Sequence, residues 1–122
     1  MDGNKSNGDS GSTGRRGLSL GYGVRENESQ AELYIDFGAE QEARNQEVFN
    51  QFLKERASIE MDFGGPLDWQ DLPDSRGCCI RKIVEGGYRS PVDEQPEIFA
   101  RLVDAMIRLD KTFKPFIQKL GS

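Results

Sequence analysis

The chain has 122 residues, of which 35% are hydrophobic and 30% charged, and this length suits one domain with a single core. It carries 21 acidic residues against 16 basic ones, and this net charge of −5 is the opposite of what proteins that bind nucleic-acid phosphates non-specifically usually show. Because the chain contains no histidine, imidazole acid–base chemistry, Ser-His-Asp and Cys-His arrangements and most zinc sites are excluded within it.

The first part of the chain predicts a tail followed by a β-hairpin. Residues 2–17 hold no apolar side chain and are rich in Gly, Ser and Asn, so we expect a flexible segment over residues 1–16 and a single α+β domain over 17–120. Two segments then alternate between apolar and polar residues, with a polar turn at 26–29 between them. Their apolar positions are Leu18, Leu20, Tyr22 and Val24, followed by Ala31, Leu33, Ile35 and Phe37.

The middle of the chain predicts a helix, a short strand and a turn. Apolar residues recur at helical spacing from about Glu40 to Phe63, and the sequence Gly-Gly-Pro at 64–66 ends the pattern. Leu67 and Trp69 then alternate with polar residues as a short strand, and residues 73–77 have the composition of a turn.

A fourth strand follows, in which Ile80, Lys82 and Val84 share a face with Cys78. The adjacent Cys78 and Cys79 point to opposite faces of such a strand, and a bridge between neighbours would strain the peptide unit, so we expect two reduced thiols. One of them would pack in the core.

The last segment predicts a long amphipathic helix. Asp93 is the expected N-cap, Pro96 fits the first turn, and Pro115 predicts a kink or a break near Lys114. The apolar ladder of this helix consists of Phe99, Leu102, Val103, Met106, Leu109, Phe113, Phe116, Ile117 and Leu120.

The order of these elements is ββαββα. Strands that come in pairs with helices between the pairs favour a four-stranded, mostly antiparallel sheet with both long amphipathic helices on one face. We therefore predict a two-layer α+β fold whose exposed sheet face or edges can receive another molecule.

Six residues are candidates for ligand or partner binding. A basic cluster around the fourth strand could bind phosphate, nucleic acid or an acidic partner, or could pair with nearby acidic residues as an ordinary surface lattice. Two aromatic residues on strands could line a groove or simply pack in the core. The basic candidates are Arg76, Arg81, Lys82 and Arg89, and the aromatic ones are Trp69 and Tyr34.

Several segments resemble a bacterial and archaeal family of domains of unknown function. The similar parts are AELYIDFG (Glu32 to Asp36), the segment from Ile59 to Trp69, and Asp74, Arg76 and Ile80 of the following loop and strand. The glycine-rich entry from Ser10 to Val24 extends the resemblance over most of residues 10–120. Cys79 stands where the family pattern has a second arginine, although Arg81 lies two residues on and could share that face.

The resemblance implies a setting more than a mechanism. Such domains occur alone or at the C-terminal end of proteins whose front half looks like a restriction-type nuclease, which suggests DNA defence or mobile elements. A nuclease centre of that type needs clustered carboxylates and a nearby lysine, and no such triplet occurs on a strand here.

We therefore expect a non-catalytic interaction or accessory domain without a cofactor, and the alternative is a nucleic-acid or phosphate-ligand binding domain that uses the basic cluster. The chain starts later than family members with an extra N-terminal helix, so we expect uncovered apolar surface and a symmetric dimer, with a larger protein as a further candidate partner. With no membrane span or secretory signal in the sequence, the expected location is the cytoplasm.

Overall fold

A computed structural model describes residues 11–12, 16–71 and 77–120. The predicted hairpin is confirmed: β2 (Leu18–Val24) and β3 (Glu28–Ile35) pair antiparallel, with Leu20 opposite Leu33. A hydrogen bond of 2.9 Å from the Arg25 N–H to the Glu28 carbonyl closes the turn. The alternation of the two segments therefore produces a ribbon with one apolar face.

The sheet is antiparallel throughout and has the order β1-β2-β3-β5-β4. β5 (Cys78–Glu85) pairs with the whole of β3, whereas β4 (Asp68–Gln70) covers only residues 79–81 of β5. The short strand β1 (Gly11–Ser12) pairs with Ser19 and Leu20 of β2. β1 lies within the segment expected to be flexible, most of which is outside the described residues, as is most of the turn predicted at 73–77.

The first predicted helix is two helices. α1 (Glu42–Lys54) and α2 (Arg56–Phe63) meet at Glu55, whose φ and ψ of −101° and 16° interrupt the helical geometry. The two segments pack on different partners, because α1 contacts β3 and β5 while α2 contacts the last helix. Gly64 ends α2 in the left-handed conformation with φ 102°, as the sequence Gly-Gly-Pro predicts.

The last helix, α3 (Gln95–Lys119), is longer than predicted. Pro115 lies inside it without ending it, because its ring is exposed and the carbonyl that loses its N–H partner belongs to the exposed Lys111. Asp93 is not the N-cap: it belongs to the 3₁₀ turn η2 (Val92–Glu94) that precedes α3.

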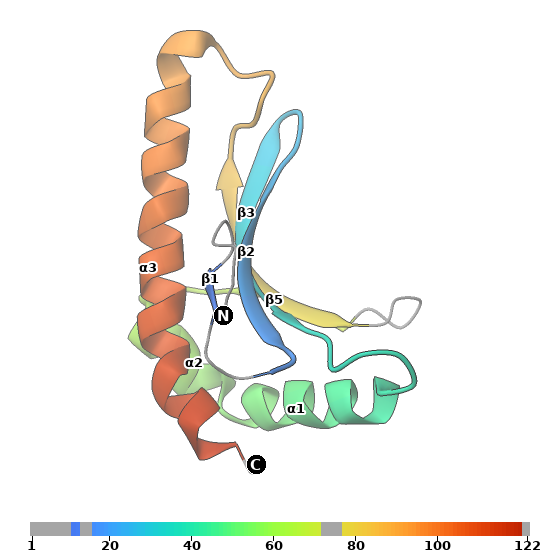
Figure 1. Cartoon of the computed structure of the whole chain (residues 1–122). Helices are drawn as coiled ribbons and strands as arrows, with labels where there is room; N and C mark the ends of the chain where they lie inside the picture. The colour runs from blue at the N-terminus through green and yellow to red at the C-terminus, as the bar shows by residue number, and fades with distance from the viewer. Residues whose placement is uncertain (1–10, 13–15, 72–76, 121–122) are drawn as a thin grey trace, which may run out of the picture.

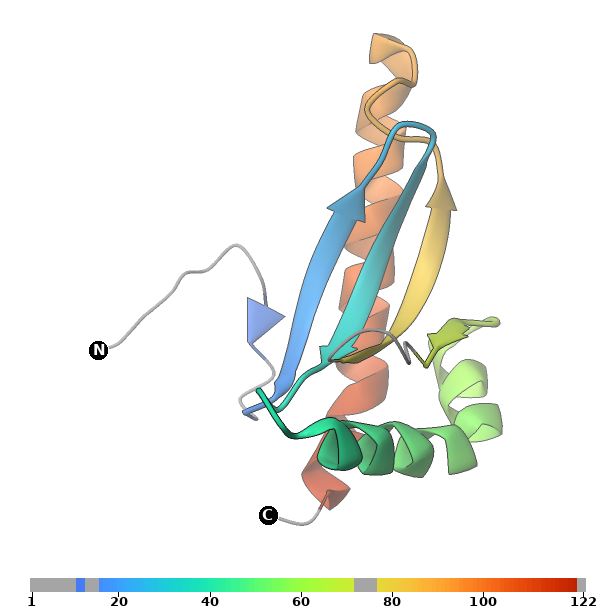
Figure 2. The ribbon, with the colours of Figure 1, turned by 90° about the vertical axis from the view of Figure 1, so that its right-hand side faces the viewer.

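The helices cover one face of the sheet, as predicted, and the fold is two-layer α+β. Figure 1 shows α3 running along the strands and α1 lying crosswise at their lower end. Figure 2 looks onto the opposite face of the sheet, with α3 behind it. The core between the layers is centred on fully buried residues, among them Leu33, Ile35, Phe52, Ile80, Leu109 and Phe113. None of the helices in the described part of the chain has the length and apolar character that a membrane crossing requires.

Candidate functional site

Arg81 lies on the sheet face that the helices leave uncovered. Its Nε donates a 2.6 Å hydrogen bond to Oδ2 of Asp68 on β4, and its Nη1 donates a 2.7 Å hydrogen bond to Oε1 of Gln30 on β3. Burial opposes both charges, but this pairing outweighs it: the pKa of Asp68 is lowered and the pKa of Arg81 is raised. The Arg81 guanidinium thus links β3, β4 and β5, and its hydrogen bonds to Asp68 and Gln30 would compete with a ligand.

The structure does not bring the basic candidates together. Lys82 follows Arg81 on the strand and therefore points to the opposite face, beside α3. Arg89 lies beyond the end of β5, where its Nε is 3.6 Å from Oε1 of Glu26 in the β2–β3 turn. Arg76 is outside the described residues. Among the described candidates, no joint basic surface exists for a phosphate to occupy.

Trp69 anchors β4 to α2. Its Nε1 and the Leu67 N–H both donate to Oε2 of Glu60, at 3.0 and 2.9 Å. These hydrogen bonds, that of Leu67 first, outweigh the opposing effect of burial and lower the pKa of Glu60. The indole also meets the Phe49 ring edge-on, with centroids 6.2 Å apart. Its contacts are those of a core residue with one polar anchor.

Tyr34 lies on the uncovered face and packs over Gly77. A Cβ built on Gly77 would lie 2.7 Å from Cζ of Tyr34 and 2.5 Å from the Ile35 carbonyl oxygen, closer than real Cβ contacts allow. Position 77 therefore requires glycine, because any other residue would bring a Cβ too close to Tyr34 and to the Ile35 carbonyl.

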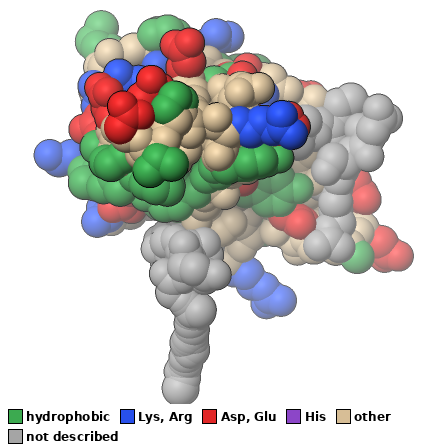
Figure 3. Space-filling model, turned by 90° about the horizontal axis from the view of Figure 1, so that it is seen from above, with side chains coloured by type: hydrophobic (Ala, Val, Ile, Leu, Met, Phe, Trp, Pro, Cys, Tyr) green, Lys and Arg blue, Asp and Glu red, His purple; other side chains and the backbone are tan. Residues whose placement is uncertain are grey.

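A larger feature is an apolar surface made by one flank of α3 and the neighbouring end of β2. We call it the α3–β2 surface. Figure 3 shows it as a continuous apolar band across the molecule seen from above. Its members and their exposed fractions are Tyr22 (45%), Val24 (43%), Phe99 (53%), Val103 (50%) and Ile107 (61%).

The sequence pattern did not reveal this surface. The ladder predicted that Phe99 and Val103 face the sheet, yet both are half exposed, whereas Leu102 and Leu109 are buried. Ile107 could have indicated this surface. Phe99, Val103 and Ile107 are four residues apart, and this spacing places them on a flank of the helix that turns away from the other ladder residues. The apolar residues of α3 therefore span a wider part of its circumference than the sheet covers.

The chain matches a known protein family over most of its length. The family model described as "Domain of unknown function (DUF4268)" matches residues 9–117. The chain belongs to the DUF4268 family. No curated protein and no solved structure matches it. The match confirms the expected membership of a family of domains of unknown function.

The two cysteines of this DUF4268 domain are adjacent on β5. Cys78 and Cys79 form no disulfide, as predicted for adjacent cysteines on a strand, and both are buried although only one was expected in the core. Burial, reinforced by the Glu32 charge, raises the pKa of Cys79 to about 11, so its thiol stays protonated and weakly nucleophilic at neutral pH. Within residues 11–12, 16–71 and 77–120, no three Cys, Asp or Glu side chains gather as a metal site requires.

Proposed function

We propose that this DUF4268 domain is a non-catalytic interaction module that forms a two-fold dimer through the α3–β2 surface. The observation that carries the proposal is the concentration of half-exposed apolar side chains on one flank of a helix in a strongly charged protein. Contiguous apolar surface of this kind, bordered by polar residues, is typical of protein–protein contacts.

The size of the surface fits the centre of an interface. Its five side chains expose between 43% and 61% of their area, which amounts to roughly 400 Å² if a whole aromatic side chain contributes about 150–250 Å². A standard interface takes about 800 Å² from each partner, with an apolar centre and a polar rim. The α3–β2 surface supplies about half of that area, and the surrounding polar residues would supply the rest.

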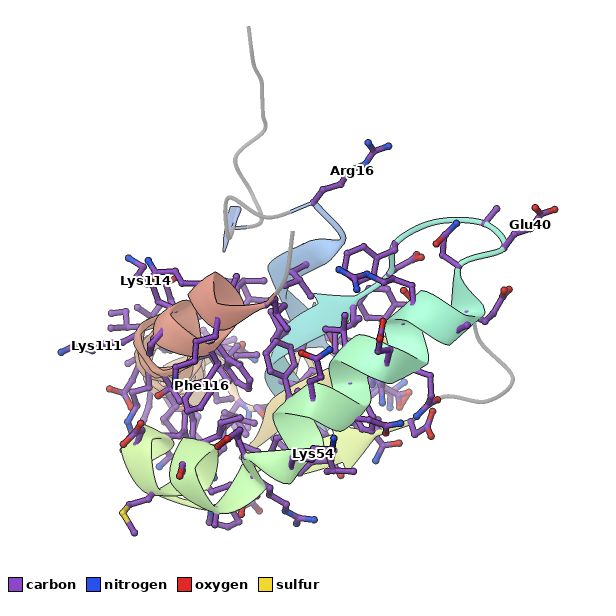
Figure 4. All side chains as sticks on the ribbon, turned by 90° about the horizontal axis from the view of Figure 1, so that it is seen from below. Arg16, Glu40, Lys54, Lys111, Lys114 and Phe116 are labelled. Carbon is purple, nitrogen blue, oxygen red and sulfur yellow. The ribbon has the colours of Figure 1, made fainter. Side chains whose placement is uncertain are left out.

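The charges along α3 favour a second copy as the partner. Exposed acidic residues precede it at Asp93 and Glu94, and exposed lysines lie near its end at Lys111 and Lys114. Between them lie Asp110 and the two ion pairs of Glu97 with Arg101 and of Asp104 with Arg108. In Figure 4, Lys111 and Lys114 point away from the protein at the end of α3, while Phe116 points toward α1 and α2. Two antiparallel copies of α3 would place each acidic end beside a basic end, whereas parallel copies would place like charges together.

A two-fold axis at Val103 gives this pairing a register. Phe99 of one copy then lies opposite Ile107 of the other, so the apolar stripe covers itself. Lys114 is eleven residues from the axis, about 16 Å, and Glu94 is nine residues from it on the other side, about 14 Å. The lysine of one copy therefore comes beside the acidic start of the other helix.

The uncovered end of β2 lies on the same side of the molecule. Among the described residues, β1 pairs with β2 only at Ser19 and Leu20, so residues 21–24 form an open edge (Figure 2). This stretch reads Gly-Tyr-Gly-Val and carries neither charge nor proline, the devices that usually protect such edges. A partner that covers α3 would protect this edge as well.

The family resemblance adds a setting to this proposal. If the domain works in DNA defence or on mobile elements, dimerisation would hold two copies of an attached or bound protein together. The dimer itself needs no nucleic acid, because its charges and apolar side chains are complementary to one another.

The test is the molar mass of the full chain in solution with Val103→Glu. Two-fold symmetry places this substitution in the interface twice, so the dimer dissociation constant should rise at least about 100-fold, measured by light scattering and analytical ultracentrifugation. Met61→Glu is the matched control, because Met61 is 81% exposed on α2 and lies outside the surface. Met61→Glu should melt at nearly the same temperature as the parent, and Val103→Glu should unfold cooperatively at a temperature lowered only by the lost association.

Two results would overturn the proposal. The first is a parent protein that stays monomeric up to millimolar concentration. The second is a dimer that Met61→Glu weakens as much as Val103→Glu does. Salt-dependent binding of short DNA or RNA by a monomer would instead support the nucleic-acid alternative.

A further inference from the structure

The other flank of α3 borders a groove of about 510 Å³. Residues 82–85 of β5 form one wall and residues on α3 between Glu97 and Arg108 form the other. On α3, Ala100 and Asp104 line this groove, whereas Phe99 and Val103 belong to the α3–β2 surface. The groove is therefore separate from the proposed dimer contact and does not depend on it.

The strand wall of the groove is an open sheet edge. β3 pairs with β5 along its whole length, but β4 covers only residues 79–81, and no other described strand lies outside residues 82–85 (Figure 2). In an antiparallel ladder, alternate residues turn their N–H and C=O groups toward the same neighbour. This edge therefore offers backbone donors and acceptors in a row, on which an extended peptide can form the next strand.

The floor of the groove is apolar. Val84 points to the helix side of β5, is 6% exposed, and packs with Ile98 and Leu102 in a small cluster separate from the main core. Ala100 and Ala105 of α3 add small side chains beside it. An apolar side chain of a bound peptide would find contact here without displacing a polar group.

Three cations line the rim of the groove. Arg101 pairs with Glu97 at 2.9 Å and Arg108 pairs with Asp104 at 3.7 Å. Lys82 makes no ion pair with any residue that the structure describes, although it is partly buried between the strand edge and α3. Its ammonium is the one charge of the groove that a ligand carboxylate could neutralise without breaking an existing pair.

We infer that this groove binds an extended peptide of another protein, which adds as an antiparallel strand to residues 82–85 of β5 beside β4. Side chains alternate along the added strand, so those opposite Lys82 and Val84 enter the groove, and those opposite Ile83 and Glu85 face the other side of the sheet. Because the peptide runs antiparallel to β5, its sequence from N- to C-terminus reads apolar, any residue, acidic.

The charge of Lys82 affects strand addition at this edge in two ways. A charged side chain that points inward at a sheet edge disfavours indiscriminate strand addition, because an apolar strand would have to bury the ammonium unpaired. The same ammonium favours the strand that brings a carboxylate to it. The residue therefore selects a ligand and excludes a second copy of this edge.

The experiment measures binding of the full chain to an array of seven-residue peptides. Each peptide is polythreonine except at two positions, which lie two residues apart and are varied through all residue types. Binding should be strongest for peptides that carry Val or Ile followed two residues later by Asp or Glu. The best peptide is then measured by fluorescence anisotropy. Replacing its acidic residue by Lys, or methylating alternate backbone nitrogens on its β5-facing side, should weaken binding at least about tenfold.

A charge exchange decides whether Lys82 is the contact. Lys82→Glu should weaken binding of the acidic peptide at least about tenfold and restore binding of the peptide that carries Lys instead. Lys54→Glu is the control, since Lys54 is an exposed residue of α1 that does not line the groove, and the substitution makes the same change of charge. The inference is wrong if no peptide of the array binds, if backbone methylation has no effect, or if both variants bind the acidic peptide like the parent.

Discussion

The two flanks of α3 meet solvent beside two half-open edges of the same sheet, yet their chemistry is opposite. On the β2 side, the edge at residues 21–24 is uncharged and the helix flank is apolar. On the β5 side, Lys82 stands on the edge and two ion pairs cover the helix flank. The comparison teaches that the uncharged edge lies beside the apolar surface that we propose as a dimer contact, whereas the edge with Lys82 lies beside the groove that we propose as a peptide site.

After that of Val103→Glu, the largest effect on the dimer should come from the charges at the two ends of α3. Lys114→Glu should weaken the dimer about tenfold, because a rim pair is worth under about 1 kcal/mol but two-fold symmetry places the change in the interface twice. Glu94→Lys in the same chain should restore the affinity. Sedimentation equilibrium of both variants in low salt measures the effect, and high salt should reduce it.

Lys119→Glu provides the comparison for this experiment, since Lys119 is also exposed at the end of α3 but lies five residues further along. A dimer that Lys114→Glu leaves unchanged, or that Glu94→Lys fails to restore, would exclude the antiparallel register centred on Val103.

A smaller effect should follow from removing the protection of the β5 edge. Lys82→Val leaves this edge without its inward-pointing charge, as on the β2 side, so we expect species larger than the dimer to form as the protein concentration rises. Light scattering across a dilution series detects them. Lys54→Val on α1 should produce no such species, and a Lys82→Val protein that stays dimeric would show that Lys82 does not protect the edge.

A local effect on stability should follow at Glu60, which anchors β4 to α2 through Leu67 and Trp69. Glu60→Gln keeps the shape of the side chain but removes the charge that accepts hydrogen bonds from Leu67 and Trp69, which should cost about 1–2 kcal/mol of unfolding free energy at pH 7. Faster hydrogen exchange should follow at residues 79–81, which β4 covers.

The effect of pH on this variant has a definite sign. The pKa of Glu60 is lower in the folded protein than its usual 4.5, so the carboxylate contributes fully to stability above about pH 4.5 and loses that contribution as the pH falls through its folded pKa. Urea unfolding of the parent and of Glu60→Gln should therefore differ at pH 7 and converge toward pH 3. A constant difference would contradict this account, and Glu55→Gln at the exposed junction of α1 and α2 should match the parent at both pH values.

Most of the fold could be predicted because its elements have clear periods. The period of two assigned Leu20 and Leu33 to the apolar face of one hairpin, and it also assigned Arg81 and Lys82 to opposite faces of their strand. The helix break at Glu55 could not be predicted, since the apolar spacing runs through it. Pro115 predicted a kink or a break near Lys114, and the break is wrong, because an exposed proline leaves the unpaired carbonyl to solvent and α3 continues to Lys119.

The candidate site was harder to predict than the fold. Closeness in sequence grouped Arg81 and Arg89, but an extended strand moves its residues apart by about 3.3 Å each. Arg81 pairs with Asp68 in the middle of β5, whereas Arg89 pairs with Glu26 beyond its end. Trp69 was predicted to line a groove or to pack, and in the structure it donates a hydrogen bond to Glu60 and contacts the Phe49 ring.

The sequence by itself determined which residues form strands and helices and which side chains share a face, because these properties depend on the local periods of two and 3.6 residues. Only the tertiary structure decided where α3 lies across the strands, and thereby which part of its apolar arc is covered. That position depends on the packing of side chains distant in sequence, such as Phe52 against Phe113 with ring centroids 5.4 Å apart. It leaves Phe99, Val103 and Ile107 exposed on one flank and opens the groove beside Lys82 on the other.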